Sequence, residues 1–196
     1  MRYPDVPDYS KSKVDKAGDI IRSSKPDSDE YRDALNIVND WRVCHAYPVN
    51  TFVATLRKKV RKYKDPIVAQ RLKRLPTIVN KLDREPSMKL SRMHDIAGVR
   101  GVVKTMDDLN KLVGEYKRAK FLHELKNTYD YIDNPKLDGY RSVHLVYKYC
   151  STSTRTKQYE GLQIELQLRT RLQHDWATAL ETISTFRNES FKTGGG

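Results

Sequence analysis

The chain has 196 residues and a formal net charge of +12 at pH 7, with 37 Lys and Arg against 25 Asp and Glu. This length suits one domain with a substantial buried core, and no apolar run is long enough to span a membrane. The basic surplus points to a polyanionic partner such as a nucleotide, a nucleic acid or an anionic lipid.

Neither the N-terminus nor the cysteines indicate secretion. The first thirteen residues have no apolar stretch behind their charges, so no signal peptide is expected. Cys44 and Cys150 lack the spacing of a metal site or of a disulfide framework. We therefore expect a cytoplasmic protein with no membrane partner.

The N-terminal third is expected to be helical. Residues 1–28 are rich in proline and polar side chains, which is typical of a weakly ordered arm or a short helix. Apolar residues at helical spacing follow in residues 31–41, after an acidic start at Ser28. Pro48 is expected to break the chain before another helical stripe in residues 52–60.

A basic segment comes next. Asp65 and Pro66 are expected to open a third helix, which Pro76 must interrupt because proline removes a helical hydrogen bond. Residues 70–75 would then form a bend that displays basic side chains. Pro76 itself suits the first position of the following helix.

Residues 96–104 are apolar and β-branched, as in a buried strand. Asp95 and Arg100 are five positions apart, so in one unbroken strand their side chains would face opposite sides of the sheet. Either Asp95 precedes the strand or Gly98 marks a β-bulge. Thr105 is suited to capping the helix that follows.

The C-terminal half alternates between polar and apolar residues. Residues 125–132 are expected to form a strand rich in tyrosine, and residues 140–150 a second strand. The alternation is clearest in residues 161–170, where one face is leucine and isoleucine and the other is polar. Residues 172–183 then carry a helical apolar stripe, in which Trp176 is expected to be buried.

This order of elements indicates an α+β fold, with a mixed β-sheet of about five strands flanked by helices. We expect an N-terminal helical region, residues 1–65, packed on a core of residues 66–190. Residues 191–196 would form a glycine-rich tail, and the whole would be a single domain.

Two acids on separate predicted strands are candidates for catalysis. Asp95 leads one strand, and Glu165 lies on the polar face of another between two glutamines. Such a pair suits a Mg²⁺ ion near phosphates, because Mg²⁺ prefers hard oxygen ligands. An ordinary solvated sheet face is the alternative for Glu165. Four basic residues would neutralise a triphosphate: Arg71, Lys73, Lys81 and Arg84.

Four segments resemble, in order, the motifs of RelA/SpoT-type alarmone synthetases, and no P-loop or kinase signature is present. They read RLKRLPTIVNK, DIAGVR, NPKLDGYRSVH and ELQLRT, at residues 71–81, 95–100, 134–144 and 165–170. The resemblance covers roughly half of the chain. It implies a nucleotidyltransferase-like synthetase fold and a small member that carries the synthetase alone.

The resemblance also implies a pyrophosphokinase, which moves the β,γ-diphosphate of ATP to a ribose 3′-hydroxyl and releases AMP. Asp95 and Glu165 would hold Mg²⁺, and Glu165 would take the proton of the acceptor hydroxyl. The residues that would bind ATP are Arg71, Lys73, Lys81, Arg84 and Arg100. Of these, Arg71 and Arg100 would enclose the adenine. The residues that would bind the acceptor are Tyr140, Lys136, His144 and Gln167. Of these, Tyr140 would stack on the acceptor base.

Three acceptor hypotheses follow. Similarity to the toxic branch of the family, in residues 41–48 and 89–93, and the high charge favour the 3′ end of tRNA. That branch also makes adenosine alarmones, and the tRNA hypothesis implies a translation-inhibiting toxin with an antitoxin protein or domain. The alternatives are a guanosine nucleotide, converted to (p)ppGpp, and an inactive RNA-binding module. Two residues of these motifs also have a structural alternative: His144 could be a hydrogen-bonded histidine within the sheet, and Arg169 could form an ion pair with an acid. His174 is assigned no role.

Overall fold

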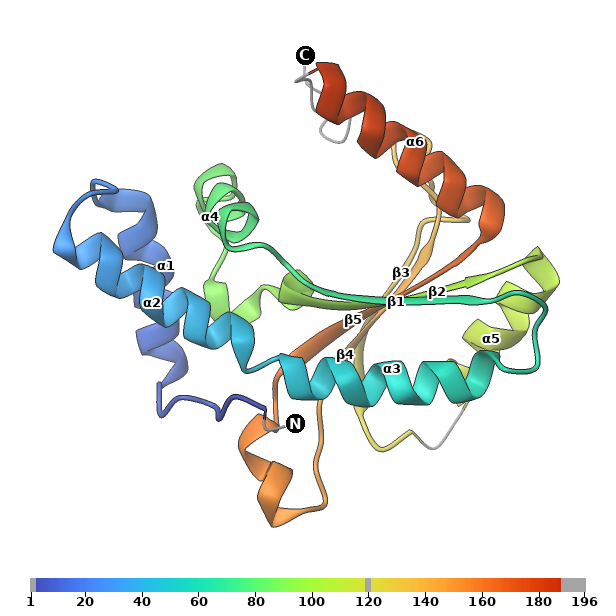
Figure 1. The fold of residues 1–196 in the computed structure, drawn as a ribbon, viewed down its shortest axis with the longest axis horizontal. Helices are drawn as coiled ribbons and strands as arrows, with labels where there is room; N and C mark the ends of the chain where they lie inside the picture. The colour runs from blue at the N-terminus through green and yellow to red at the C-terminus, as the bar shows by residue number, and fades with distance from the viewer. Residues whose placement is uncertain (1–2, 119–120, 188–196) are drawn as a thin grey trace.

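The computed structural model describes residues 3–118 and 121–187, which form a mixed sheet with helices on both faces (Figure 1). The strands lie in the order β1-β2-β5-β4-β3. Strands β2 and β5 are parallel, and the other neighbouring pairs are antiparallel. The expected α+β fold with about five strands is therefore confirmed. The strands are β1 (Ile67–Leu72), β2 (Ala97–Val103), β3 (Glu124–Asp130), β4 (Val143–Lys148) and β5 (Gln163–Thr170).

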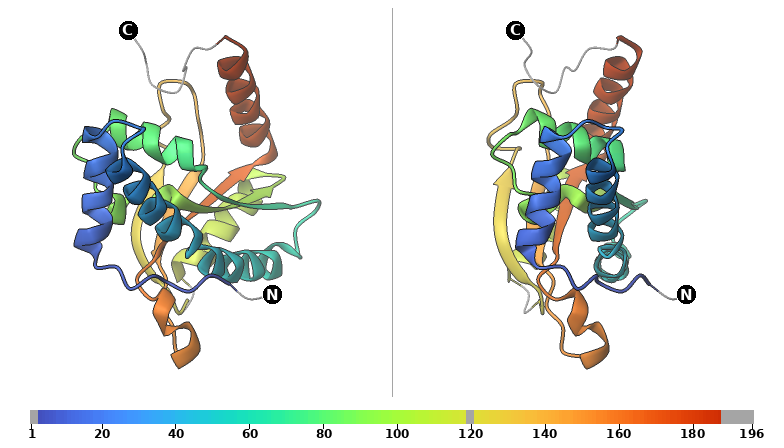
Figure 2. Two further views of the ribbon diagram at one scale, coloured as in Figure 1. Left: turned by 60° about the vertical axis from the view of Figure 1, so that its left-hand side comes forward. Right: turned by 90° about the vertical axis from the view of Figure 1, so that its left-hand side faces the viewer.

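The helices divide between the two faces of the sheet. Helices α3 (Ala46–Val60) and α5 (Met106–Arg118) cover one face, while α4 (Leu75–Arg84) and α6 (Arg171–Arg187) rise at opposite ends of the other (Figures 1 and 2). Helices α1 (Lys11–Ser23) and α2 (Asp29–Val43) pack against each other and against α4. No helix in the described part of the chain is long and apolar enough to cross a lipid bilayer.

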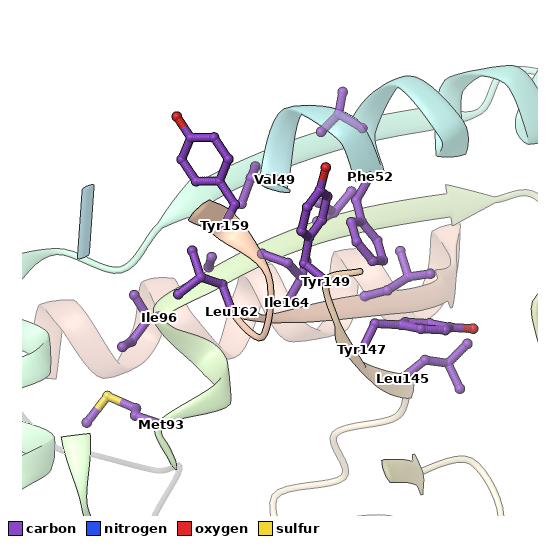
Figure 3. Close-up of a cluster of buried hydrophobic side chains, with 14 of the residues drawn as sticks. Val49, Phe52, Met93, Ile96, Leu145, Tyr147, Tyr149, Tyr159, Leu162 and Ile164 are labelled. Atoms are coloured by element: carbon purple, nitrogen blue, oxygen red, sulfur yellow. The ribbon is translucent and has the colours of Figure 1, made fainter. Parts of the chain in front are cut away.

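Much of the hydrophobic core lies between α3, α5 and the apolar face of the sheet, and the same cluster continues among α1, α2 and α4. Phe52 of α3 packs against Tyr147 of β4, with ring centroids 5.6 Å apart. Figure 3 shows these rings beside Leu145 and Ile164, the inward residues of β4 and β5. Alternation in the strands thus gives one buried apolar face and leaves the polar side chains on the other.

Gly101 of β2 marks a close approach of α3 to the sheet. A β-carbon at Gly101 would lie 3.0 Å from the Leu168 side chain and 3.2 Å from that of Leu56. Gly101→Ala is therefore expected to lower the free energy of unfolding by about 1–3 kcal/mol, the usual cost of overpacking a core. Urea unfolding measures the change. Gly98→Ala is the matched control in the same strand, since its β-carbon would meet only the Glu165 carbonyl oxygen at 3.8 Å; equal destabilisation of both variants would contradict this.

Residues 65–75 fold differently from the sequence-based prediction. The helix expected to open at Asp65 and Pro66, and the bend expected at residues 70–75, are wrong because Ile67–Leu72 forms β1. This edge strand is largely exposed, so it lacks the apolar alternation that marks a buried strand. The break expected at Pro48 is also wrong, since α3 continues through it.

Local start signals were predicted correctly. Ser28 caps α2 by accepting a hydrogen bond from the Tyr31 amide at 3.2 Å, and Thr105 accepts one from the Asp108 amide at 3.1 Å. Pro76 lies in the first turn of α4. The glycine-rich tail at residues 191–196 lies outside the described residues.

Candidate active site

The polar face of the sheet brings together residues from separate motifs. Gly98 of β2 lies opposite Arg71 of β1 and opposite Glu165 of β5, and Arg100 lies opposite Gln167. Paired residues share a face, as do residues two apart in a strand. Arg71, Arg100, Glu165 and Gln167 therefore face the same side, away from the core.

Asp95 lies just before β2, in the short 3₁₀ turn His94–Ile96. Pairing through Gly98 is continuous, so the first alternative for Asp95 is correct and there is no bulge. The Asp95 carboxylate accepts hydrogen bonds from Lys73 Nζ at 2.8 Å and from Lys81 Nζ at 3.0 Å. Lys73, which follows β1, and Lys81, which lies in α4, thus both contact the Asp95 carboxylate.

The ionisation of Asp95 is expected to stabilise the fold. Burial raises the pKa of Asp95, but the charges and hydrogen bonds of Lys73 and Lys81 outweigh it and lower the pKa to about 2. Because the folded pKa is below the unfolded value of about 3.9, this stability is complete above about pH 5 and is lost progressively as the pH falls through about 2. Its size is on the order of 2 kcal/mol.

Melting temperatures between pH 2 and pH 7 test this expectation. Asp95→Asn should flatten the acid limb of the stability curve, because the substituted side chain does not titrate. Asp83→Asn, at an exposed position of α4, should keep the wild-type dependence. Parallel curves for the wild type and Asp95→Asn would show that the lysine contacts do not stabilise the carboxylate.

Glu165 is held at both carboxylate oxygens. His144 Nδ1 lies 2.9 Å from Oε1, and Gln167 Nε2 donates to Oε2 at 2.6 Å. Arg100 in turn donates from Nε and Nη2 to the Gln167 side-chain oxygen, at 3.3 Å each. Burial raises the pKa of Glu165, but the bonds from His144 and Gln167 outweigh it and lower that pKa. Glu165, only 7% exposed, is therefore a buried carboxylate that stays ionised at neutral pH.

Aromatic side chains border Glu165 on the β3–β4 side. Tyr140 Oη lies 2.9 Å from His144 Nε2, and the Tyr131 ring meets the His144 ring edge to face with centroids 5.0 Å apart. Lys136 Nζ lies over both tyrosine rings, 4.6 Å from the Tyr131 centroid and 5.3 Å from that of Tyr140. The loop before β4 thus presents two aromatic rings and a cation next to the acid.

The part of the sequence that forms this polar face matches a known family. A family model described as a region found in RelA / SpoT proteins matches residues 70–190, more than half of the chain. The chain belongs to the RelA/SpoT family. Its polar sheet face, with Asp95 and Glu165, lies within the matched region.

Similar proteins include two GTP pyrophosphokinases of Bacillus subtilis. YwaC is 36% identical over 114 residues, which cover 55% of this chain and 52% of YwaC. YjbM is 33% identical over 119 residues, covering 60% of this chain and 55% of YjbM. The chain therefore spans about half the length of these curated relatives. A crystal structure of small alarmone synthetase 1 from Bacillus subtilis, bound to its product pppGpp, matches with a TM-score of 0.65 at 26% identity, covering 75% of this chain and 79% of that one.

Most of the residues expected from the RelA/SpoT motifs meet on this face, but Arg84 does not. Its side chain is 60% exposed and donates a hydrogen bond to Glu85 at 3.2 Å. Lys81, one helical turn earlier, instead reaches Asp95. Sequence spacing alone did not separate these two basic residues of α4.

One expectation about the C-terminal part of this RelA/SpoT chain is corrected. Trp176 is 52% exposed rather than buried, because α6 rises away from the sheet, and its indole N–H donates to the Asp138 carbonyl at 3.4 Å. Arg169 is 2% exposed, and its guanidinium meets His174 Nδ1. Burial, together with the charge of Arg100, outweighs the charge of Glu181 and lowers the pKa of Arg169 to about 10.

His94 was missed by the sequence analysis. Its Nε2 lies 3.9 Å from Glu165 Oε1, and its ring stacks on Tyr129 with centroids 5.9 Å apart. The only signal in the sequence was its position next to Asp95.

Proposed function

We propose that this chain is an ATP-dependent pyrophosphokinase, which transfers the β,γ-diphosphate of ATP to the 3′-hydroxyl of GDP or GTP. The observation that carries the proposal is a buried, ionised Glu165 on the same sheet face as cationic Arg71 and Arg100, with Asp95 and its two lysines at the edge of that face. Phosphoryl transfer is catalysed mainly by positioning and by charge stabilisation, and these residues offer both.

The donor side would use the cations around Asp95. Lys73 and Lys81 are positioned to exchange the Asp95 carboxylate for phosphate oxygens, which carry more negative charge. Arg71 and Arg100 lie on neighbouring strands. Burial is the main cause that lowers the pKa of Arg100, and the positive charge of Arg71 lowers it further. A planar adenine between two guanidinium groups would separate these like charges and stack on both.

The acceptor side would use the aromatic loop and the acid. Tyr140 offers a ring for stacking on the acceptor base, and Lys136 offers a charge for its phosphates. Each oxygen of Glu165 already accepts one hydrogen bond, which leaves a second lone pair on each. Glu165 can therefore still accept the proton of the ribose hydroxyl as a general base.

A divalent cation such as Mg²⁺ fits the donor atoms present. Asp95 and Glu165 supply hard carboxylate oxygens, and within the described residues no group of three or more His, Cys, Asp and Glu forms a closed metal site. That suits an ion that is held by one or two carboxylates and takes its other ligands from phosphates and water. When bound, the ion would offset the negative charge of the phosphates.

The choice of acceptor in this proposal is supported by the relatives. Both Bacillus subtilis relatives are named GTP pyrophosphokinases, which supports a guanosine nucleotide. The 3′ end of tRNA, placed first in the sequence analysis, stays a prediction, as do the toxin role and the antitoxin partner. The charge of +12 and the half-exposed Trp176 near the acceptor loop favour that larger acceptor.

Incubation with γ-labelled ATP and either GDP, GTP or deacylated tRNA tests the proposal. Label on the guanosine nucleotide is the expected result. Label on tRNA alone would replace the guanosine acceptor with the tRNA prediction. Label on none of them, with folded protein, would contradict pyrophosphokinase activity and favour the inactive RNA-binding module.

A further inference from the structure

His144 has no free ring nitrogen to offer a substrate. Its side chain is only 9% exposed, with Nδ1 at 2.9 Å from Glu165 Oε1 and Nε2 at 2.9 Å from Tyr140 Oη. We propose that His144 is a positioning residue that orients Glu165, rather than a contact to the acceptor as the family resemblance implies. This inference rests on the proposed function, in which Glu165 is the general base.

The hydrogen bonds fix the direction of the contact. A carboxylate oxygen accepts hydrogen bonds, so His144 Nδ1 is the donor in its 2.9 Å contact with Glu165 Oε1. The other ring nitrogen, Nε2, lies 2.9 Å from the Tyr140 hydroxyl oxygen. The result is a hydrogen-bonded chain that connects Tyr140, His144 and Glu165.

Glu165 needs such support because its terminal torsion has no sharp preference. Gln167 holds Oε2 and His144 holds Oε1, so the two contacts together fix the plane of the carboxylate. The His144 ring is itself clamped edge to face by Tyr131 and Tyr140, at 5.0 and 5.8 Å between centroids. The Glu165 carboxylate is therefore held in one orientation and rarely adopts an unproductive one.

The chain also links the two tasks on the acceptor side. The ring of Tyr140 is expected to stack on the acceptor base, while its hydroxyl supports the histidine that orients the base catalyst. Loss of His144 should therefore reduce turnover and leave acceptor binding intact. A direct acceptor contact would have the opposite signature, with weakened binding.

Three His144 variants separate these outcomes. His144→Ala should lower kcat about 100-fold at saturating ATP and GDP, the scale expected when a reacting group is misplaced by about 1 Å, while the Kd for GDP measured by calorimetry stays within about threefold. His144→Asn should recover most of the loss, because its amide nitrogen lies near the Nδ1 position and can donate to Glu165. His144→Gln should not, because its amide reaches toward the Nε2 position instead. A GDP Kd weakened tenfold or more in all three, with kcat preserved, would overturn the inference.

A spectroscopic measurement keeps the test independent of turnover and of the stability of the variants. In the wild-type protein, nitrogen-15 NMR should show the His144 proton on Nδ1, and in Glu165→Ala this fixed protonation should be lost. A wild-type ring protonated on Nε2 alone would overturn the inference even if the enzyme is active. Conversely, absence of diphosphate transfer in the wild type, with the Nδ1 proton observed, would contradict the proposed function and leave the His144–Glu165 contact established.

Discussion

Glu165→Gln is expected to lower kcat for diphosphate transfer by about 10²–10⁴-fold, the usual contribution of a general base. Glutamine has the shape of glutamate and can still accept a hydrogen bond from His144, but it is neutral and cannot take the proton of the acceptor hydroxyl. Initial rates of AMP release at saturating ATP and GDP measure the effect.

The fold should survive this substitution, because the side-chain volume is unchanged and a buried charge is removed. Glu124→Gln is the matched control, since Glu124 is an exposed acid on β3 that pairs with Lys126 and Lys148. It should keep full activity. Near-normal turnover by Glu165→Gln would show that another group takes the proton.

Asp95→Asn is expected to lower kcat at least about 100-fold. Charge stabilisation of the phosphates by a carboxylate-bound cation is worth several kcal/mol, and each 1.4 kcal/mol is a factor of ten in rate. Without metal, however, the affinity for ATP should not fall, because Lys73 and Lys81 lose the acid that occupies them. The substitution should thus separate turnover from nucleotide binding.

Steady-state kinetics with Mg²⁺ and equilibrium binding of ATP in a chelator measure these two effects. Asp83→Asn, at an exposed position of the same α4 region, serves as the control and should behave as wild type. If Asp95→Asn kept kcat within about threefold of wild type, Asp95 would have no part in holding the phosphates or their cation.

The polar face of β5 could be predicted from the sequence because its cause is local. Strict alternation in Gln163–Thr170 placed Glu165 and Gln167 on one face, and the registers of β2 and β4 then confirm which residues lie beside them. Helix starts at Ser28 and Thr105 were equally local, since a cap depends on three or four consecutive residues.

Other features depend on contacts that the sequence does not encode locally. β1 is an exposed edge strand whose conformation is set by pairing with β2, so its own pattern looked irregular. The apolar residues at helical spacing around Trp176 correctly predicted helix α6. They could not show whether another element packs against that face of the helix. The partners of His144 likewise follow from the pairing of β4 with β5, which brings residues 21 positions apart into contact.

Transfer of diphosphate as one unit is tested most directly by following ATP labelled at either the α or the γ phosphate, in the presence of GDP. We expect the α label in AMP and the γ label in the guanosine product, in equal amounts, and we expect Glu165→Gln to slow the appearance of both by about 10²–10⁴-fold. Recovery of the α label in ADP would show transfer of a single phosphate and would contradict the account.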